Sequence, residues 1–200
     1  MYKKILLILL LCLFSVSAWK SMRRFQFINN CPQTLWIGGM GNPQISRTGW
    51  EMPAHTEYNL NVPANTFAIR FWARTGCRWV SGQFKCDTGD CGASLNNFGV
   101  ECKGISGQSP ATLVEFTLSS TGGSDFYDLS NVDGNNMGIE FGPIPGTYQK
   151  VNNPDLGKFN CGTPGCRFNQ QLCPQEITLE TSSGKYCMSI CAAVNNAQQV

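Results

Sequence analysis

The sequence has little charge, a single histidine and no second long apolar run after its first residues. Charged residues make up 14% of its 200 residues, and His55 is the one histidine. His55 lies in a polar segment with no serine or cysteine pattern near it, so no Ser/His/Asp nucleophilic site is predicted. No stretch shows a sustained helical period, which argues against an all-helical fold. The aromatic content of 11% is that expected of a chain that buries a core.

The first residues have the pattern of a secretory signal peptide. Two lysines precede an apolar run from Ile5 to Val16, and Val16-Ser17-Ala18 offers the small residues that signal peptidase prefers. A membrane anchor is the alternative, but the run is shorter than the roughly 20 residues that span a bilayer. We expect a signal peptide over residues 1–18 and a soluble, secreted, extracellular protein with no stable membrane anchor.

Removal of the signal peptide balances the charge of the chain. Residues 1–18 contain Lys3 and Lys4 but no acid, so 13 basic and 13 acidic residues remain of the 15 and 13 in the whole sequence. A chain without net charge does not attract a polyanion, and no nucleic-acid partner is predicted.

The cysteines predict a disulfide framework. Cys12 leaves with the signal peptide, and an even number remains: Cys31, Cys77, Cys86, Cys91, Cys102, Cys161, Cys166, Cys173, Cys187 and Cys191. In an exported chain such a set favours disulfides over free thiols. Zinc is the alternative, because two Cys-x4-Cys pairs could each present two thiolates. Oxidising export and the single histidine argue against zinc, and no metal or cofactor is predicted.

Residues 19–142 read as an all-β domain. Short segments that alternate with period two are separated by Gly, Pro and Asn turns, a pattern typical of a β-sandwich or flattened barrel. The run 67–74 places Phe67, Ile69, Phe71 and Ala73 on one face and Arg70, Trp72 and Arg74 on the other. The run 113–118 places Val114, Phe116 and Leu118 inward and Glu115 opposite.

Residues 143–200 have a different character. Prolines and glycines interrupt the segment, and it has too few apolar residues for a core of its own, so disulfide staples are expected to hold it. We expect a second, loop-rich domain packed on the sandwich. Residues 179–189 could form a short helix or a hairpin, and the pattern does not decide between them.

Several motifs in order resemble the thaumatin-like family, which includes the plant pathogenesis-related, osmotin-type proteins. They are residues 25–31 (FQFINNC), 72–77 (WARTGC), 82–92 (GQFKCDTGDCG) and 126–134 (FYDLSNVDG). The resemblance covers nearly the whole chain after the signal peptide. It implies a thaumatin-like β-sandwich with an appended disulfide-rich domain. The Cys161-x4-Cys166 spacing and Leu172-Cys173-Pro174 resemble animal members more than plant ones.

The resemblance also implies a disulfide pattern. Three pairs keep the family's partners: Cys77–Cys86, Cys91–Cys102 and Cys173–Cys187. The family's partners of Cys31, Cys161, Cys166 and Cys191 would lie beyond Val200. These four cysteines are therefore expected to be unpaired or to find new partners, and a C-terminally truncated product is the favoured explanation.

The family's cleft between domains is lined by one arginine and four acids. The resemblance assigns Arg74, Glu115, Asp128 and Asp133 to this cleft, with the fourth acid beyond Val200. Such carboxylates could accept hydrogen bonds from sugar hydroxyls. Structural roles remain alternatives: Glu115 on a solvated strand face, Asp128 and Asp133 as turn formers, and Arg74 as a partner of the acids. Asp90 is interpreted as a turn cap. Trp36, Trp72, Trp79 and Tyr127 could stack on sugars, but core positions are favoured for most of them.

Three functions follow from the resemblance. The favoured one is a secreted defence protein, monomeric and antifungal, that binds fungal or microbial wall β-1,3-glucan. The second is a weak endo-β-1,3-glucanase that uses Glu115 and Asp128 as its catalytic pair. The third is an inert or degenerate family member.

Overall fold

The structure, a computed structural model, describes residues 21–92, 99–119 and 123–197, and it is all-β as predicted. The predicted signal peptide lies outside the described residues. The largest sheet has five strands in the order β3-β2-β5-β8-β9. They are β2 (Leu35–Asn42), β3 (Gly49–Met52), β5 (Phe67–Arg74), β8 (Leu113–Thr117) and β9 (Phe126–Ser130). All of its neighbouring strands pair antiparallel.

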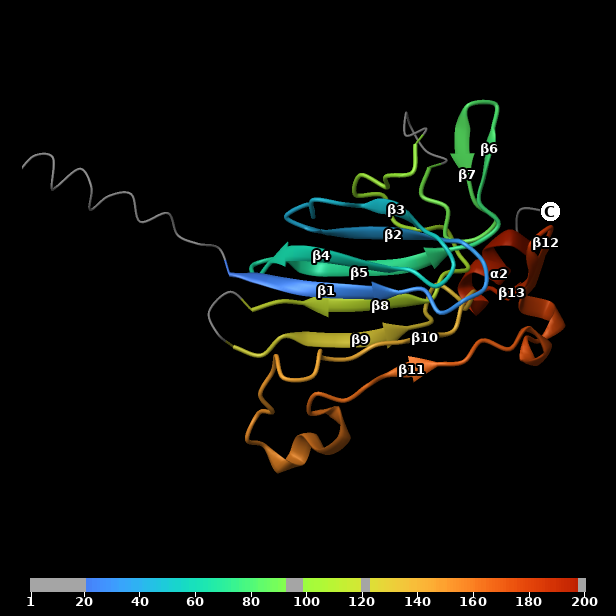
Figure 1. The fold of residues 1–200 in the computed structure, drawn as a ribbon. Helices are drawn as coiled ribbons and strands as arrows, with labels where there is room; N and C mark the ends of the chain where they lie inside the picture. The colour runs from blue at the N-terminus through green and yellow to red at the C-terminus, as the bar shows by residue number, and fades with distance from the viewer. Residues whose placement is uncertain (1–20, 93–98, 120–122, 198–200) are drawn as a thin grey trace, which may run out of the picture.

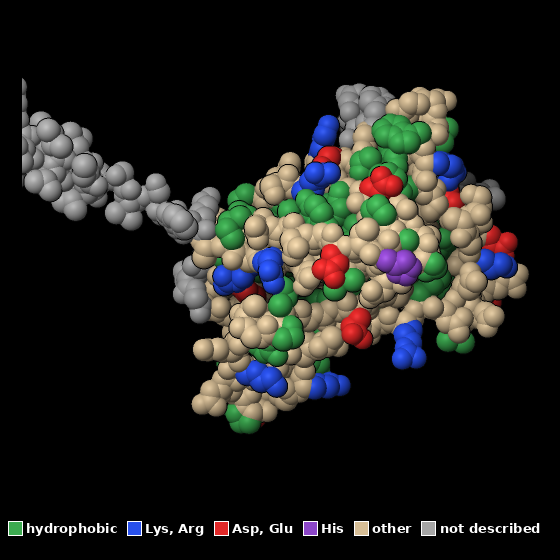
Figure 2. Space-filling view, in the orientation of Figure 1, with side chains coloured by type: hydrophobic (Ala, Val, Ile, Leu, Met, Phe, Trp, Pro, Cys, Tyr) green, Lys and Arg blue, Asp and Glu red, His purple; other side chains and the backbone are tan. Residues whose placement is uncertain are grey.

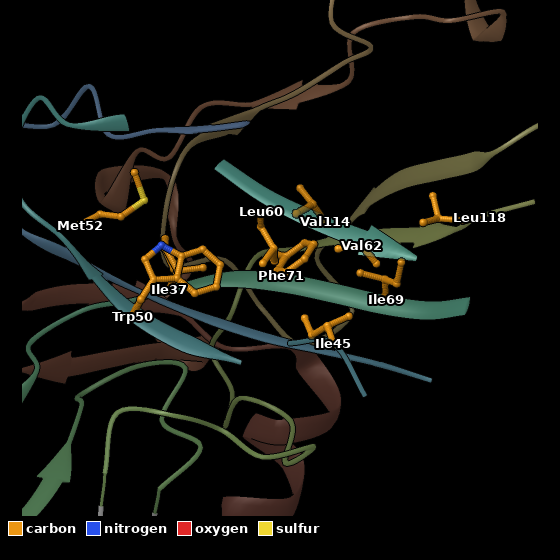
Figure 3. Packing of buried hydrophobic residues seen from close by; sticks show 11 residues of the cluster. Ile37, Ile45, Trp50, Met52, Leu60, Val62, Ile69, Phe71, Val114 and Leu118 are labelled. Carbon is orange, nitrogen blue, oxygen red and sulfur yellow. The ribbon is translucent and has the colours of Figure 1, made fainter. Parts of the chain in front are cut away.

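A second layer covers one face of this sheet. β1 (Met22–Ile28) pairs with β4 (Glu57–Pro63), and Figure 1 shows the pair lying alongside the larger sheet. The core lies between the two layers, with Val62 and Leu60 of β4 against Ile69 and Phe71 of β5 (Figure 3). Because side chains of a strand alternate between its faces, the apolar positions at every second residue form this core. The predicted inward position of Val114 is confirmed.

Trp72 dominates the opposite face of the sheet. It packs with Leu113 and the Cys91–Cys102 bond beneath the long segment between β7 (Gln83–Lys85) and β8. Its indole nitrogen donates a hydrogen bond to the carbonyl oxygen of Gly89 at 2.8 Å. A Cβ on Gly38 would lie 2.3 Å from the indole carbon Cε2, so only glycine lets this strand approach the ring.

One prediction about β5 is wrong. Phe67 does not share the core face of Ile69 but is 49% exposed. Arg70 pairs with Met40 and Phe67 with Asn42, so β5 has one residue more than β2 across this interval. Ala68, with φ at 49°, lies in this β-bulge. The extra residue breaks the period-two alternation on which the prediction depended.

The chain after β10 (Ile139–Glu140) contains short elements and little core. It forms the 3-10 helices η1 (Pro154–Phe159), η2 (Gln170–Leu172) and η3 (Gln175–Ile177), strand β11 (Gly165–Cys166), the hairpin β12 (Thr178–Thr181) and β13 (Gly184–Cys187), and helix α2 (Ile190–Ala197). Tyr186 is the one buried residue among positions 143–195. The hairpin settles the choice left open for residues 179–189. The division into two domains stays a prediction.

The three disulfides implied by the resemblance are present. They join Cys77 to Cys86, Cys91 to Cys102 and Cys173 to Cys187. The first closes the hairpin of β6 (Arg78–Val80) and β7. The third ties the segment after η2 to β13. Within the described ranges, four cysteines have no disulfide partner: Cys31, Cys161, Cys166 and Cys191.

Candidate functional site

Three charged side chains lie in a row across three neighbouring strands. In the register of the sheet, Arg70 of β5 is opposite Glu115 of β8, which is opposite Asp128 of β9. Directly opposite residues of an antiparallel pair have Cβ atoms about 5 Å apart on the same face. The arginine Nε donates a hydrogen bond to Glu115 Oε1 at 2.7 Å. The sheet thus holds one cation and two carboxylates side by side; we call these three residues the charged row.

A shallow depression of about 230 Å³ lies over the charged row. We call it the β5–β9 depression. Its lining residues come from strands β5, β8 and β9 and are Ala68, Ile69, Arg70, Glu115, Phe116, Thr117, Phe126 and Asp128. The volume is below the roughly 300–1,000 Å³ of pockets that enclose a small molecule. The shape fits a ligand that lies across the surface better than one that is engulfed.

The two carboxylates of the depression have different surroundings. Glu115 forms its ion pair with Arg70, and its side chain is 26% exposed. Among the described residues, no arginine or lysine forms an ion pair with Asp128. Partial burial raises the pKa of the Asp128 carboxyl, and the negative charge of Glu115 raises it further. Asp128 therefore keeps its proton to a higher pH than an ordinary aspartate.

Arg74, the arginine predicted for the cleft, lies in the interior instead. It is 0% exposed, and its Nη2 donates to the carbonyl oxygens of Ile37 at 2.8 Å and Val100 at 2.9 Å. Its guanidinium carbon lies 5.3 Å from the centre of the Phe84 ring. Burial lowers the pKa of Arg74 to about 10, although Asp90 and Glu101 act in the opposite direction. Arg74 thus supports the fold, and the arginine beside Glu115 is Arg70.

Strand alternation placed Arg70 and Arg74 on the same face of the strand, and the family resemblance assigned Arg74, not Arg70, to the cleft. The choice depends on the register between β5 and β8, which brings Glu115 opposite Arg70. No motif in the sequence reports that register. The sequence indicates only that Arg70 alternates with Trp72 and Arg74 on one face of the strand.

The remaining acids predicted from the sequence lie apart from the depression. Asp133 lies in the turn after β9, where its carbonyl oxygen accepts hydrogen bonds from Ala111 N at 2.9 Å and Ser109 Oγ at 2.8 Å. It is not among the residues that line the β5–β9 depression. Asp90 caps a turn as predicted, because its carboxylate accepts hydrogen bonds from the backbone N of Gly92 and Cys86.

Asp87 is a further ionic contact that sequence reasoning missed. Its side chain is 8% exposed, and it pairs with Arg78 and accepts a hydrogen bond from Ser182 Oγ at 3.0 Å. Burial by itself would raise the pKa of Asp87. Hydrogen bonds from Arg78, Ser183 and Ser182, with the charge of Arg78, outweigh burial and lower it. Asp87 thereby connects the β6–β7 hairpin to the β12–β13 hairpin.

Most of the aromatic candidates pack against other side chains. Trp72 is buried, the ring centres of Trp36 and Phe84 are 4.6 Å apart, and Tyr127 donates its hydroxyl to Gly162 O at 2.8 Å. Trp79 is 59% exposed on the β6–β7 hairpin, which contributes no residue to the depression. The aromatic residue that does line it and is exposed is Phe126, which was not predicted.

On the face shown in Figure 2, basic and acidic side chains are scattered among one another, with no continuous stripe of positive charge. Within the described residues, no cluster of three or more His, Cys, Asp and Glu side chains is placed to hold a metal ion. No helix in that part of the chain is long and apolar enough to cross a membrane.

Comparisons with known proteins find relatives along most of the chain. The model of the Thaumatin family matches residues 29–200. Thaumatin-like protein 1 of Pyrus pyrifolia is 38% identical over 197 residues, or 95% of this chain and 74% of the relative. A Prunus avium protein named glucan endo-1,3-beta-glucosidase is 37% identical over 179 residues, or 86% of this chain and 66% of the relative.

A solved thaumatin-like xylanase inhibitor is also similar, with a TM-score of 0.46 and 21% identity. That match covers 82% of this chain and 91% of the inhibitor. The two relatives named above are longer than this chain, which spans about two thirds to three quarters of their lengths.

Proposed function

The chain belongs to the thaumatin family, and we propose that it is a secreted protein that binds β-1,3-glucan or a related wall polymer through the β5–β9 depression. The observation that carries the proposal is the charged row of Arg70, Glu115 and Asp128 beneath an open surface. The proposal moves the arginine of the site from the predicted Arg74 to Arg70.

The chemistry of the row suits a polyhydroxylated ligand. Carboxylates accept hydrogen bonds from sugar hydroxyls, and hydrogen bonds to an ionised group are stronger than those between neutral groups. Because Arg70 holds Glu115 at 2.7 Å, the glutamate enters the interaction already positioned. A shallow surface lets a polysaccharide chain continue beyond both ends of the site. The name of the Prunus avium relative supports a β-1,3-glucan as the ligand class.

Secretion and a role in defence complete the proposal. The signal peptide predicted over residues 1–18 and the three disulfides support export into an oxidising compartment. A protein that binds a microbial wall polymer outside the cell is suited to defence against fungi, the role that the family resemblance implies. In this proposal, Asp133 contacts only a long ligand that extends past the end of β9.

Co-sedimentation with insoluble β-1,3-glucan tests the proposal. We expect Asp128→Asn and Glu115→Gln to reduce the bound fraction severalfold, because each removes a charged acceptor from the depression. Glu176→Gln is the matched control: it neutralises an exposed acid in η3, which does not line the depression. Equal retention of all three folded variants would exclude the charged row as the site. Failure of the folded wild type to bind any wall glucan would favour an inert family member.

Hydrolysis is the second candidate, and one observation favours it. Two carboxylates stand side by side, one paired with a cation and the other with a raised pKa. A glycosidase needs this division, because one carboxyl must donate a proton while the other is ionised. These surroundings make Asp128, and not Glu115, the better proton donor.

Binding without turnover remains the favoured outcome because Asp128 is exposed. A hydrated carboxyl is mostly ionised at neutral pH and has little proton to donate. We expect no release of reducing sugar from laminarin by the purified wild type. If the wild type releases reducing sugar and Asp128→Asn does not, the protein is an endo-β-1,3-glucanase and the binding proposal is wrong.

A further inference from the structure

Phe126 is a large apolar residue exposed beside the charged row. It is 69% exposed, whereas its neighbours Phe116, Tyr127 and Phe141 pack their rings against one another at 5.4 Å and 5.7 Å. A single exposed apolar side chain needs no explanation. Phe126 differs because it also lines the β5–β9 depression together with charged residues. Its ring is thus available to a ligand that contacts the carboxylates.

The strand geometry fixes how Phe126 and the charged row are arranged. Phe126 and Asp128 are two residues apart on β9, so they share a face and lie about 6.8 Å apart along the strand. Phe126 is opposite Thr117, as Asp128 is opposite Glu115. An aromatic ring therefore follows the acids directly along the same face of the sheet.

Ala68 keeps the surface beside the ring open. It lines the depression from β5, and it occupies the bulge with φ at 49°. A non-glycine residue in this region of φ is uncommon, and such backbone outliers gather at functional sites. The bulge brings a methyl group, instead of a longer side chain, to this side of the depression.

We infer that Phe126 is a stacking platform for a pyranose ring, and that the β5–β9 depression selects sugars with equatorial hydroxyls. Such a ring is apolar on its C–H faces and polar around its rim. The π surface of Phe126 packs against a C–H face of the sugar ring. The charged row forms hydrogen bonds with the rim hydroxyls of the same or the adjacent sugar unit. This inference rests on the proposed function and adds to it a residue that distinguishes sugars by the shape of their rings.

β-Linked glucans meet this requirement, because glucose carries its ring hydroxyls equatorially. Mannose has an axial hydroxyl at C2 that interrupts one C–H face. Hydrogen bonds from the charged row to hydroxyls other than the one at C2 would not distinguish the two sugars, because glucose and mannose differ in configuration at C2 alone. We therefore expect the ring contact to contribute a preference for laminarin over a soluble β-mannan.

Calorimetric titration with laminarin tests the inference. We expect Phe126→Ala to weaken binding about tenfold, the loss typical of an aromatic anchor residue. Phe126→Trp should keep the affinity, and Phe126→Leu should lose most of it because leucine has no π surface. Val132→Ala is the matched control, an equally accessible apolar residue at 77% exposure that does not line the depression. Because Phe126 is exposed, all of these variants should unfold at the temperature of the wild type.

A second pair of variants tests the open side of the site. Asparagine tolerates the left-handed backbone conformation, so Ala68→Asn should fold and reduce the affinity by adding volume to the depression. Ala68→Gly should fold and keep the affinity.

The outcomes separate the inference from the proposed function. If Asp128→Asn weakens binding while Phe126→Ala binds as well as the wild type, the stacking platform is wrong and the proposed function stands. Equal affinity of the wild type for laminarin and β-mannan also contradicts the inference. If the folded wild type binds no laminarin, both the inference and the proposed function are overturned.

Discussion

The two arginines of β5 allow fold and function to be tested separately. Arg74 is completely buried, and Arg70 lies partly exposed beside Glu115 with 41% of its side chain accessible. We expect Arg74→Met to destabilise the protein strongly and Arg70→Met to leave its stability nearly unchanged. Methionine is chosen for both because its flexible chain replaces the apolar stem of arginine.

The magnitudes follow from the contacts. Arg74→Met removes the donor from two carbonyl oxygens, that of Ile37, which is buried, and that of Val100, which is partly buried. A hydrogen bond from a charged group contributes about 1.5 kcal/mol or more, so the loss is about 3 kcal/mol. For a domain of this size the midpoint temperature should fall by roughly 6–12 °C. The partly exposed pair of Arg70 and Glu115 contributes at most about 1 kcal/mol to stability.

Thermal unfolding followed by circular dichroism measures both effects, with glucan co-sedimentation performed on the same preparations. Arg70→Met should unfold near the wild-type temperature and bind glucan weakly. An Arg74→Met protein as stable as the wild type would contradict the assignment of Arg74 to the interior. Equal destabilisation by both substitutions would show that Arg70 also supports the fold and would remove the distinction between them.

Two further predictions concern stability, and a third concerns the accessibility of the disulfides. Asp87 has a lowered pKa, so its contribution to stability is present above the ordinary value of 3.8 and is lost as pH falls below it. Acid titration of Asp87→Asn should therefore show a smaller loss of stability below about pH 4 than the wild type; an unchanged acid transition would count against the contacts of the Asp87 carboxylate with Arg78 and the serines. Gly38→Ala should lower the free energy of unfolding by about 1–3 kcal/mol, because its Cβ would meet Trp72, and chemical denaturation measures this. In the native protein, Cys173–Cys187 should be reduced and alkylated before Cys91–Cys102, whose cysteines are 2% and 0% exposed; mass spectrometry showing the opposite order would contradict the burial of that bond.

Local alternation and turn residues were sufficient to predict the strands and much of the core. The positions of Ile69, Phe71 and Val114 follow from period two alone. The position of Phe67 does not follow this period, because a bulge inserts one residue into the strand. The sequence does not indicate the bulge, since position 68 is alanine and not glycine, the usual residue at a positive φ. The three disulfides came from the family resemblance rather than from spacing.

The sequence analysis named part of the candidate site. Glu115 and Asp128 were named, and the structure brings them opposite each other on neighbouring strands. Arg70 and Phe126 were not named as site residues, because their positions in the depression depend on register and exposure. Both are properties of paired strands, which a single strand's sequence does not contain. The placement of Asp87 was missed for a related reason, since its partner Ser182 is 95 positions away along the chain.

Mapping of backbone amide chemical shifts during titration with laminari-oligosaccharides locates the glucan-binding surface residue by residue. We expect the perturbed amides to cluster on β5, β8 and β9 around Arg70, Glu115 and Phe126. We also expect the perturbations to disappear in Asp128→Asn. Perturbations confined to other surfaces, such as the β6–β7 hairpin or the segment after β10, would contradict the account.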